Sequence, residues 1–462
     1  MAVDRGCHQP STINDQQSII NDQQSTLNRM TKPIVYFFVL LFSFAAKGQD
    51  SLRLGDAINI ALKNSLDIQL ATNEVEANSI LNNIGVAGGL PFVTASVTDN
   101  EQISTINQKF NTGAPSITRA AAATNNLNSN LAASMLLYNG NRVVATKNRL
   151  AQLEKQSQEL LNSQIQNIIG SVMTGYYDIV RQQSYLRTIE RSIDASRQQL
   201  EIVQTRQKAG LANNADIFQA QIDLNALLQA QLSQQVIIDQ AKTELLRLLT
   251  LRPDSAIFIK DTILVDKTIA LDQVLNSIHQ NPDIIAASDQ VKINELIVKE
   301  TAALRYPSVR ATTGYNFNRN QAAAGQFSLN QSYGPSVGFT IGIPLYNGSS
   351  YKRQQRVAEI DVRNAALNKK VLIRDYSSQV VKSYQSYAST LKQLETEQQN
   401  YELSSQLLEL VLQRFKYKVT TIVDVKNAQQ SFEQSGFRLV NLNFAAKSAE
   451  IQLKRLGNQL KL

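Results

Sequence analysis

The sequence predicts a mostly α-helical protein made of two tandem repeats, each with two β-strands followed by two long helices. The tetrapeptide Leu-Tyr-Asn-Gly occurs at 137–140 and again at 345–348. A pair of alternating, strand-like runs precedes each copy, and a very long proline-free stretch with helical periodicity follows it. Each copy therefore marks a junction between a strand and a helix.

The duplication extends well beyond this tetrapeptide. One constant offset relates Pro91-Phe92-Val93 to Pro307-Ser308-Val309, and a second relates Tyr138 to Tyr346. The second offset persists almost to the end of the chain, where it matches Arg206 with Arg414, Lys208 with Lys416, Asp216 with Asp424 and Arg247-Leu248 with Arg455-Leu456. A register held this long predicts a first repeat at 49–252 and a second repeat at 253–462.

The N-terminal residues predict export from the cytoplasm. Residues 1–29 contain a polar direct repeat and are expected to be an upstream extension outside the mature protein. Residues 30–48 have the basic start, the apolar stretch and the small residues before a cleavage site that are typical of a signal peptide. An N-terminal membrane anchor is the alternative. The only cysteine, Cys7, precedes this segment, so disulfides and thiol chemistry are excluded from the mature chain.

Composition argues against nucleic-acid binding and against catalysis. The net charge is +8, but Lys and Arg are spread among acids and glutamines without a dense basic block, which is typical of solvated helix faces. No nucleophile–base pair, phosphate-binding loop or metal-ligand spacing occurs. His279 is the only histidine after the signal peptide, and it lies on a polar face. We therefore expect no enzyme, no cofactor and no metal site.

The strand-like runs are expected at about 92–103, 127–138, 308–318 and 333–345. Val337, Phe339 and Ile341 alternate with Gly338 and Thr340, so one face of this strand is apolar and the other small or polar. Such runs fit the strands of a membrane barrel, and they fit half-exposed soluble sheets equally well. The segments between the paired strands, 100–130 and 318–332, are polar and are expected to be loops.

The proline-free stretches predict helices of unusual length, at about 141–209, 215–250, 348–417 and 422–458. A helix of almost 70 residues is roughly 100 Å long at about 1.5 Å per residue, so it needs a packing partner along its length. Apolar residues three and four apart predict coiled-coil packing of the two long helices in each repeat. The turns are expected near 208–214, with Gly210 as the helix stop, and near 418–421.

Four strands are too few to close a membrane barrel, because about eight is the minimum. An open sheet edge cannot face lipid, since its N–H and C=O groups would stay unpaired there. If these strands span a membrane, several chains must share one barrel, and the long helices would extend from it as a shared tube. Together with the export signal, this predicts the bacterial outer membrane. The alternative is a soluble periplasmic coiled-coil adaptor or scaffold.

The two Leu-Tyr-Asn-Gly junctions, the two Pro-x-Val strand entries and the helix-tip segments 208–221 and 420–425 occur together, in this order, in one known family. The chain resembles the TolC-like outer-membrane efflux proteins over about 50–462. The resemblance implies a homotrimer with a 12-stranded barrel that continues into a periplasmic α-helical barrel, with an equatorial region at about 254–268. It also implies a passive exit duct of a tripartite efflux or type I secretion system, conducting small molecules or polypeptides. The implied partners are a periplasmic adaptor, an inner-membrane pump or ABC transporter, and outer-membrane lipid.

The resemblance also implies a gate at the periplasmic helix tips, formed by Asp216, Phe415, Thr420, Asp424 and Asn427. Asp424 is the candidate for a ring of acids facing the pore, where crowding of its copies would favour cation binding. Asn427 stands where the family's best-studied pattern has a second acid, and Phe415 and Thr420 stand where it has a tyrosine and an arginine. Asp216 then lacks its usual partners, and the lock is expected to be weaker or differently built. The alternative for both aspartates is helix N-capping.

The resemblance implies two further contact regions. Gly210 and Leu211 match the family's adaptor-contact tip, although a plain helix C-cap explains Gly210 equally well. Tyr138 and Tyr346, with the following Gly140 and Gly348, are expected at the membrane interface where the barrel passes into the helices. Ordinary packing at a turn is the alternative for the tyrosines.

Overall fold

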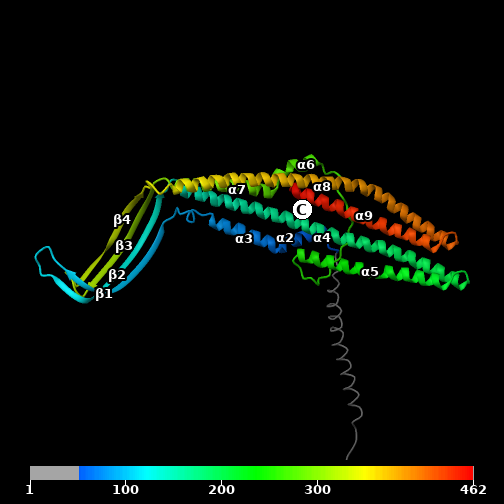
Figure 1. The fold of residues 1–462 in the computed structure, drawn as a ribbon, viewed down its shortest axis with the longest axis horizontal. Helices are drawn as coiled ribbons and strands as arrows, with labels where there is room; N and C mark the ends of the chain where they lie inside the picture. Colours follow the sequence, from blue (N-terminus) through cyan, green and yellow to red (C-terminus); the bar gives the residue numbers. More distant parts are fainter. Residues whose placement is uncertain (1–50, 461–462) are drawn as a thin grey trace, which may run out of the picture. The chain divides into compact units, whose positions relative to one another are not determined.

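The structure is a computed structural model that describes residues 51–460 (Figure 1). The expected extension at 1–29 and the expected signal peptide at 30–48 lie outside the described residues. The described chain divides into two units. The smaller unit contains 51–53 and 256–260, where the Leu52 N–H donates to the Phe258 carbonyl at 2.8 Å. The larger unit contains 54–255 and 261–460, and the elements below belong to it.

The larger unit repeats one order of elements twice. The first set is α2 (Leu54–Asn64), α3 (Leu66–Leu81), β1 (Phe92–Gln108), β2 (Ile117–Tyr138), α4 (Arg142–Lys208) and α5 (Asn214–Leu248). The second is α6 (Leu271–Ser277), the 3-10 turn η1 (Ile278–Gln280), α7 (Pro282–Ala303), β3 (Ser308–Ala322), β4 (Leu329–Gly342), α8 (Ser350–Lys416) and α9 (Ile422–Leu456). Both α4 and α8 have 67 residues, and both α5 and α9 have 35. The mostly helical two-repeat architecture is therefore confirmed, while the repeat boundary at 252–253 stays a prediction.

The four strands form one antiparallel sheet in the order β1-β2-β3-β4. The β2–β3 pairing joins the two repeats, for example through Leu131 opposite Tyr315. Residues directly opposite each other share a face of the sheet. The register therefore places the alternating apolar residues on one common face, which contains Val93, Ala95, Val97, Leu131, Ala133, Met135, Val309, Ala311, Val337, Phe339 and Ile341. The opposite face is polar.

The strands run further than the alternation predicts. Residues 100–130 and 318–332 were expected to be loops, but β1 continues to Gln108 and β2 begins at Ile117, while β3 continues to Ala322 and β4 begins at Leu329. Backbone pairing does not require alternating apolar residues, so these extensions pair although the alternation has ended. The Asn125 amide donates to Asp99 across the ladder at 2.7 Å, for example. At the other end, β4 stops at Gly342 rather than near 345.

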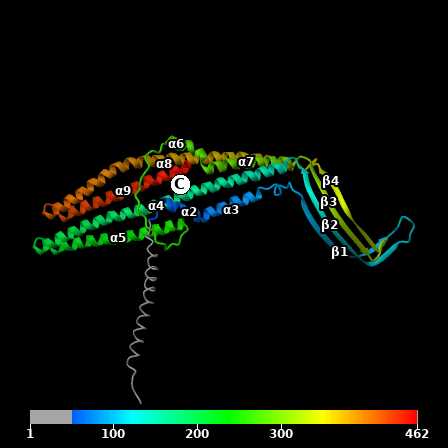
Figure 2. The same ribbon diagram turned by 180° about the vertical axis from the view of Figure 1, so that it is seen from behind.

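The helices change partners along α4 and α8. Near the sheet, the packing order is α3–α4–α7–α8, and near the other end it is α5–α4–α9–α8 (Figures 1 and 2). In both halves, α4 and α8 run through without a break while shorter helices fill the positions beside them. Among the helices of residues 51–460, none is both long and apolar enough to cross a membrane.

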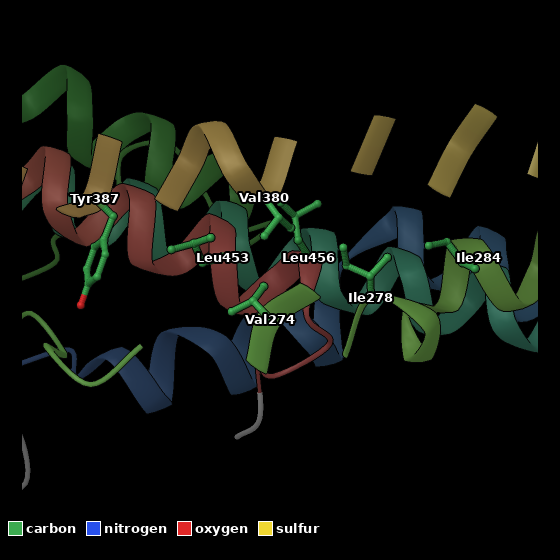
Figure 3. Close-up of a cluster of buried hydrophobic side chains, with 7 residues drawn as sticks. All are labelled: Val274, Ile278, Ile284, Val380, Tyr387, Leu453 and Leu456. Atoms are coloured by element: carbon green, nitrogen blue, oxygen red, sulfur yellow. The ribbon is translucent and has the colours of Figure 1, made fainter. Parts of the chain in front are cut away.

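A buried cluster marks the place where α7 gives way to α9. It gathers side chains of α6, η1, α7, α8 and α9, namely Val274, Ile278, Ile284, Val380, Tyr387, Leu453 and Leu456 (Figure 3). Asn281 joins the two helix ends. Its side chain accepts from the Asp283 N–H at 3.0 Å, which caps α7, and its amide donates to the Leu456 carbonyl at the end of α9 at 3.1 Å.

The expected equatorial segment, 254–268, has no regular secondary structure. Its last part is held on α9 by the buried carboxylate of Glu450. This carboxylate accepts from the Asp266 N–H, from Lys447 Nζ and from Lys454 Nζ, each at 2.9 Å. Lys447 also donates to the Leu264 carbonyl at 2.9 Å. We call the contacts of residues 261–268 with Lys447, Glu450 and Lys454 the equatorial clasp.

Candidate functional site

The first helix tip joins α4 to α5 and ends α4 with a Schellman motif. Gly210 has φ +72°, in the left-handed region. The Gly210 N–H donates to the Gln207 carbonyl at 2.9 Å, and the Leu211 N–H donates to the Arg206 carbonyl at 2.8 Å. Gly210 is therefore the helix stop. Leu211 lies just beyond it with 59% of its surface exposed.

The second helix tip joins α8 to α9 and has the same geometry with a different residue. Lys418 occupies the left-handed position with φ +63°. The Lys418 N–H donates to the Phe415 carbonyl at 3.1 Å, and the Val419 N–H donates to the Arg414 carbonyl at 3.0 Å. A side chain in this conformation costs about 1–2 kcal/mol relative to glycine. The second tip is thus the more strained of the two.

Both aspartates proposed for the gate cap the helices that follow the tips. Asp216 and Asn213 form a capping box at the start of α5, and Asp424 and Thr421 form one at the start of α9. The Asp424 carboxylate accepts from the Thr421 N–H and hydroxyl, each at 2.8 Å. The Thr421 N–H, followed by its hydroxyl, lowers the pKa of this fully exposed carboxyl below its ordinary value. Within the described residues, neither aspartate forms an ion pair.

Phe415 is the candidate gate residue that links the two hairpins. It is buried, with 3% exposure, beside Val203 of α4 and Val425 of α9. The Arg206 guanidinium of α4 lies 4.2 Å from the centre of the Phe415 ring, within range of a cation–π contact. Sequence reasoning used Arg206 only as a repeat match and missed this role.

The other two candidates do not reach the opposite hairpin through a hydrogen bond. The Thr420 hydroxyl donates to the Val411 carbonyl at 3.3 Å, inside its own hairpin. The Asn427 side chain is exposed. The Asn427 backbone carbonyl accepts from the Ser431 hydroxyl at 2.9 Å within α9.

Two polar contacts between the hairpins were not expected from the sequence. Lys426 Nζ of α9 lies 2.8 Å from Asp223 Oδ1 of α5. Further from the tips, the Arg191 guanidinium of α4 donates to the Tyr401 hydroxyl of α8 at 2.8 Å. Nothing in the local sequence distinguishes these residues from other charged positions on solvated helix faces, because the partners are about 200 residues apart.

The two strand-to-helix junctions share one turn geometry. Gly140 and Asn141 have φ +68° and +66°, and Gly348 and Ser349 have φ +64° and +61°. In the first junction, the Arg142 N–H donates to the Asn139 carbonyl at 3.3 Å; the equivalent bond in the second is 3.2 Å. Two successive left-handed residues closed by this bond define a type I′ turn, which explains the glycine at its first central position.

Tyr138 reaches the apolar face of the sheet because of a β-bulge. The β2–β3 register shifts between Leu136 and Tyr138, so that Tyr138 lies opposite Val309. Strict alternation would place Tyr138 on the polar face with Leu136 and Ser134. The bulge adds one residue to β2 before Tyr138 and so places Tyr138 on the apolar face. Tyr346 follows the end of β4 and is 87% exposed. Both positions remain candidates for the membrane interface.

Comparison with known proteins assigns the family. The chain matches the model of the outer membrane efflux protein family over residues 57–250 and 275–459, and it belongs to that family. It is 23% identical over 407 residues to the toxin and drug export protein A of Aggregatibacter actinomycetemcomitans, covering 86% of each chain. It is 24% identical over 302 residues to an uncharacterized protein of Haemophilus influenzae, spanning 64% of this chain and 65% of that relative.

Solved structures show the same fold at low sequence identity. The outer membrane protein VceC of Vibrio cholerae superposes with a TM-score of 0.72 at 18% identity, covering 87% of this chain and 96% of that chain. CusC superposes with a TM-score of 0.71 at 18% identity, covering 88% of this chain and 92% of that chain. The open state of the MtrE outer membrane channel of Neisseria gonorrhoeae gives 0.65 at 19% identity, covering 88% and 90%.

The family and the fold are those of channels rather than enzymes. The chain is an exit duct of an efflux system, located in the outer membrane and extending into the periplasm. The family match decides between the two functions that the sequence left open, in favour of the duct over a soluble adaptor or scaffold.

Proposed function

We propose that three copies of the chain close into one 12-stranded barrel that continues into a tube of helices. The observation that supports this is the pair of open sheet edges. In the order β1-β2-β3-β4, the outer edges of β1 and β4 have no neighbouring strand within the described residues. Because the strands alternate in direction, β4 of one copy can pair antiparallel with β1 of the next, and three copies supply twelve strands.

The helices have matching open edges. In the tip half, α5 and α8 are the outer members of the order α5–α4–α9–α8. Each carries exposed apolar residues at coiled-coil spacing, namely Phe218, Ile222, Leu232 and Val236 on α5, and Leu403, Leu407 and Leu410 on α8 with Tyr417 directly after its end. Their exposure ranges from 46% to 76% in the single chain, so a neighbouring copy is the natural partner for these surfaces.

The assembly is tested by the mass of the purified protein in detergent. Mass photometry or light scattering is expected to give three chains per particle. A charge at the centre of one stripe, Leu407→Glu, is expected to release monomers because it buries an unpaired charge in the interface. The matched control is Leu264→Glu, an equally large change at a position that is 75% exposed outside both stripes. A wild-type particle of one or two chains would refute the shared barrel.

We further propose that the tube is gated where the two hairpins of each copy meet. The α8–α9 hairpin is held on the α4–α5 hairpin by Arg206 against Phe415 and by Lys426 with Asp223. Asp216, Thr420, Asp424 and Asn427 belong to the same tip region and shape it through caps and turns. Breaking the contacts between hairpins lets the tip widen, while the caps keep each hairpin intact.

The gate is tested by single-channel conductance in planar bilayers. Asp223→Asn removes one ion pair between the hairpins and is expected to raise the open probability. The double variant Asp223→Lys with Lys426→Asp restores an ion pair of reversed polarity and is expected to restore the closed state. Asp239→Asn serves as a control, because the Asp239–Lys242 pair lies within α5. Equal conductance of Asp223→Asn and Asp239→Asn would contradict this gate.

For the partners, we propose a periplasmic adaptor that contacts the tips and an inner-membrane pump or ABC transporter behind it. The tips present Gly210 and the exposed apolar residues Leu211, Tyr417 and Val419. For the cargo, we propose small molecules or polypeptides, a range that the name of the relative from Aggregatibacter also covers. Leu211→Asp is expected to abolish drug resistance in cells while trimer formation and conductance persist. Retained resistance would exclude Leu211 from the adaptor contact.

A further inference from the structure

The polar face of the sheet is almost free of charge. Its positions are every second residue in 92–102, 124–136, 308–322 and 330–342. They are mainly Ser, Thr, Asn and Gly, and one row contains an asparagine from each strand, namely Asn100, Asn126, Asn320 and Asn330. Some of these amides bond across the strands; Asn130 donates to Asn316, which in turn donates to the Ser336 hydroxyl at 3.1 Å.

Arg310 is the one ionisable residue at these positions. It lies on β3 opposite Leu136 and Thr340, close to the end of the sheet that continues into the helices. Arg119, which pairs with Ile106 beyond the β-bulge, is a second charge on this face, but it lies towards the opposite end of the sheet. Because every other position of the four ranges is uncharged, Arg310 dominates the electrostatic field at the end of the sheet that continues into the helices. Its nearest hydrogen-bond partner is the Ser134 hydroxyl, at the long distance of 3.5 Å.

Arg310 lines a pocket at the junction of sheet and helices. The pocket has a volume of about 480 Å³, and its polar side chains include Arg142, Tyr306, Ser308, Arg310 and Tyr351. Gly342 also lines the pocket, and it pairs with Ser308 across β3 and β4 on the polar face. The pocket therefore opens on the polar side of the sheet, opposite the apolar face. Within the described residues, neither Arg142 nor Arg310 forms an ion pair.

The segments that line the pocket carry charges of one sign, and the nearby Glu300 pairs with Arg149 at 2.7 Å. The first turns of α4 and α8 contain no acidic residue, and residues 302–358 contain neither Asp nor Glu. The same stretch contains Arg305, Lys352, Arg353 and Arg356. Arg142 is the first residue of α4, at the positive end of the helix dipole, where a cation is disfavoured and an anion is favoured. These positive charges repel one another when the pocket is empty, and a bound anion would be attracted to them.

We propose that this pocket, the arginine pocket, binds anions inside the duct, through Arg142 and Arg310. Its ligands are the carboxylate, sulfonate or phosphate groups of molecules in the water-filled passage. The inference rests on the proposed barrel, in which the apolar face contacts lipid and the polar face lines the lumen. That orientation also argues for a water-borne anion rather than a lipid headgroup. With one copy per subunit, the pockets would form a ring of positive charge, which we call the collar, at the helix end of an almost uncharged barrel lumen.

The collar predicts anion-dependent block of the current. In planar bilayers with potassium chloride, inorganic phosphate added to the side exposed at the cell surface is expected to reduce the current through the wild-type channel. Arg310→Gln and Arg142→Gln each remove one charged donor and are expected to weaken this block roughly threefold to tenfold. The same variants are expected to shift the reversal potential in a chloride gradient towards cation selectivity.

Arg319→Gln is the matched control. Arg319 lies on the same strand, but it pairs with Leu127 on the other face of the sheet. It is expected to keep the wild-type block and reversal potential. Trimer mass and melting temperature verify that each variant is folded. Channels that conduct normally and respond equally to phosphate in Arg310→Gln and Arg319→Gln would overturn the arginine pocket and leave the duct intact. A wild-type protein without conductance would contradict the duct and the pocket together.

Discussion

The two strand-to-helix junctions have the same turn but different surroundings. A Cβ atom added to Gly140 would meet the Tyr306 Cβ at 2.7 Å and the Ala303 carbonyl oxygen at 2.9 Å, both at the end of α7. A Cβ atom added to Gly348 would meet nothing within 4 Å. The first junction is therefore completed inside the chain, and the second is open.

The repeat indicates which segment would cover the open junction in the proposed ring of copies. The offset that relates the two strand entries pairs Ala303 with Ala87 and Tyr306 with Leu90, which follow α3. Within the chain, α3 packs on α4 at the other edge of the helix layer. In the proposed ring of copies, the α3 end of the next subunit would lie where α7 lies for the first junction. The difference between the junctions is the one that the proposed ring predicts, since the second junction would be covered only by a neighbouring copy.

The same contrast appears at one ion pair in the second long helix of each repeat. In α9, Lys447 and Glu450 pair at 2.9 Å with side chains only 9% and 2% exposed. At the equivalent positions of α5, Asp239 and Lys242 pair at 3.2 Å with the charges reversed and side chains 60% and 26% exposed. Only the α9 pair lies under residues 261–268, so only there are the charges removed from water.

The largest expected effect separates these two ion pairs. Glu450→Ala leaves Lys447 buried without its partner and is expected to cost about 3–5 kcal/mol of stability. Lys242→Ala at the equivalent position of α5 is expected to cost less than about 0.5 kcal/mol. Far-UV circular dichroism melts measure both, since the chain has no tryptophan for fluorescence. Similar melting temperatures for the two variants would show that the equatorial clasp does not bury Glu450.

The next effect compares the junction glycines. Gly140→Ala combines left-handed strain with a close contact at Tyr306 and is expected to destabilise the folded subunit by roughly 2–4 kcal/mol. Gly348→Ala is expected to add only the strain, about 1 kcal/mol, to the isolated chain and to weaken the trimer as well. Melting of the protein and its dissociation on dilution in detergent separate these effects. If Gly348→Ala leaves the trimer unaffected, no neighbouring helix covers the second junction.

Acid is expected to weaken the contacts of the equatorial clasp. Within the described residues, the first repeat has no equivalent of this clasp on α5. The Thr268 hydroxyl, followed by the Lys454 ammonium, lowers the pKa of Asp266 below its ordinary value. This contribution to stability is therefore present above the unfolded-state pKa of about 3.9 and is lost as the pH falls through the folded-state pKa. The protection of residues 261–268 against hydrogen exchange, relative to the intrinsic exchange rate at each pH, is expected to fall below about pH 4. In Asp266→Asn the exchange is expected to be fast already at neutral pH, and an identical pH response would contradict the role of Asp266.

The smallest effect compares the two helix tips. Lys418→Gly is expected to stabilise the second tip by about 1 kcal/mol by relieving left-handed strain, and Gly210→Lys is expected to destabilise the first by a similar amount. Hydrogen exchange of the amides around each tip resolves such local changes. If both variants shift exchange in the same direction, the two tips do not share the Schellman geometry.

Local chemistry made part of the candidate site predictable. Gly210 follows a long helical pattern and stops it, and the Asn-Gly pairs mark both junctions, because left-handed turn positions favour these residue types. The capping alternative for Asp216 and Asp424 was also available from the sequence, since an aspartate shortly after a turn satisfies free backbone N–H groups. These features depend on residues within a few positions of one another.

Contacts between distant segments could not be predicted in this way. The cation–π contact of Arg206 with Phe415, the ion pair of Lys426 with Asp223 and the burial of Glu450 each join segments about 180–210 residues apart. A charged residue on a solvated face and one under a covering segment have the same local sequence signal. The extension of β1 and β2 beyond the alternating runs was not predicted, because backbone pairing continues where apolar and polar residues no longer alternate.

By itself, the sequence determined the repeated order of strands and long helices, their junctions and their tips, because proline exclusion, periodicity and turn residues act locally. Only the tertiary structure decided which hairpin contacts which, that a bulge turns Tyr138 onto the apolar face, and that Arg310 and Arg142 share a pocket on the polar side. Those outcomes depend on strand register and helix packing, which bring together residues that are separated along the chain.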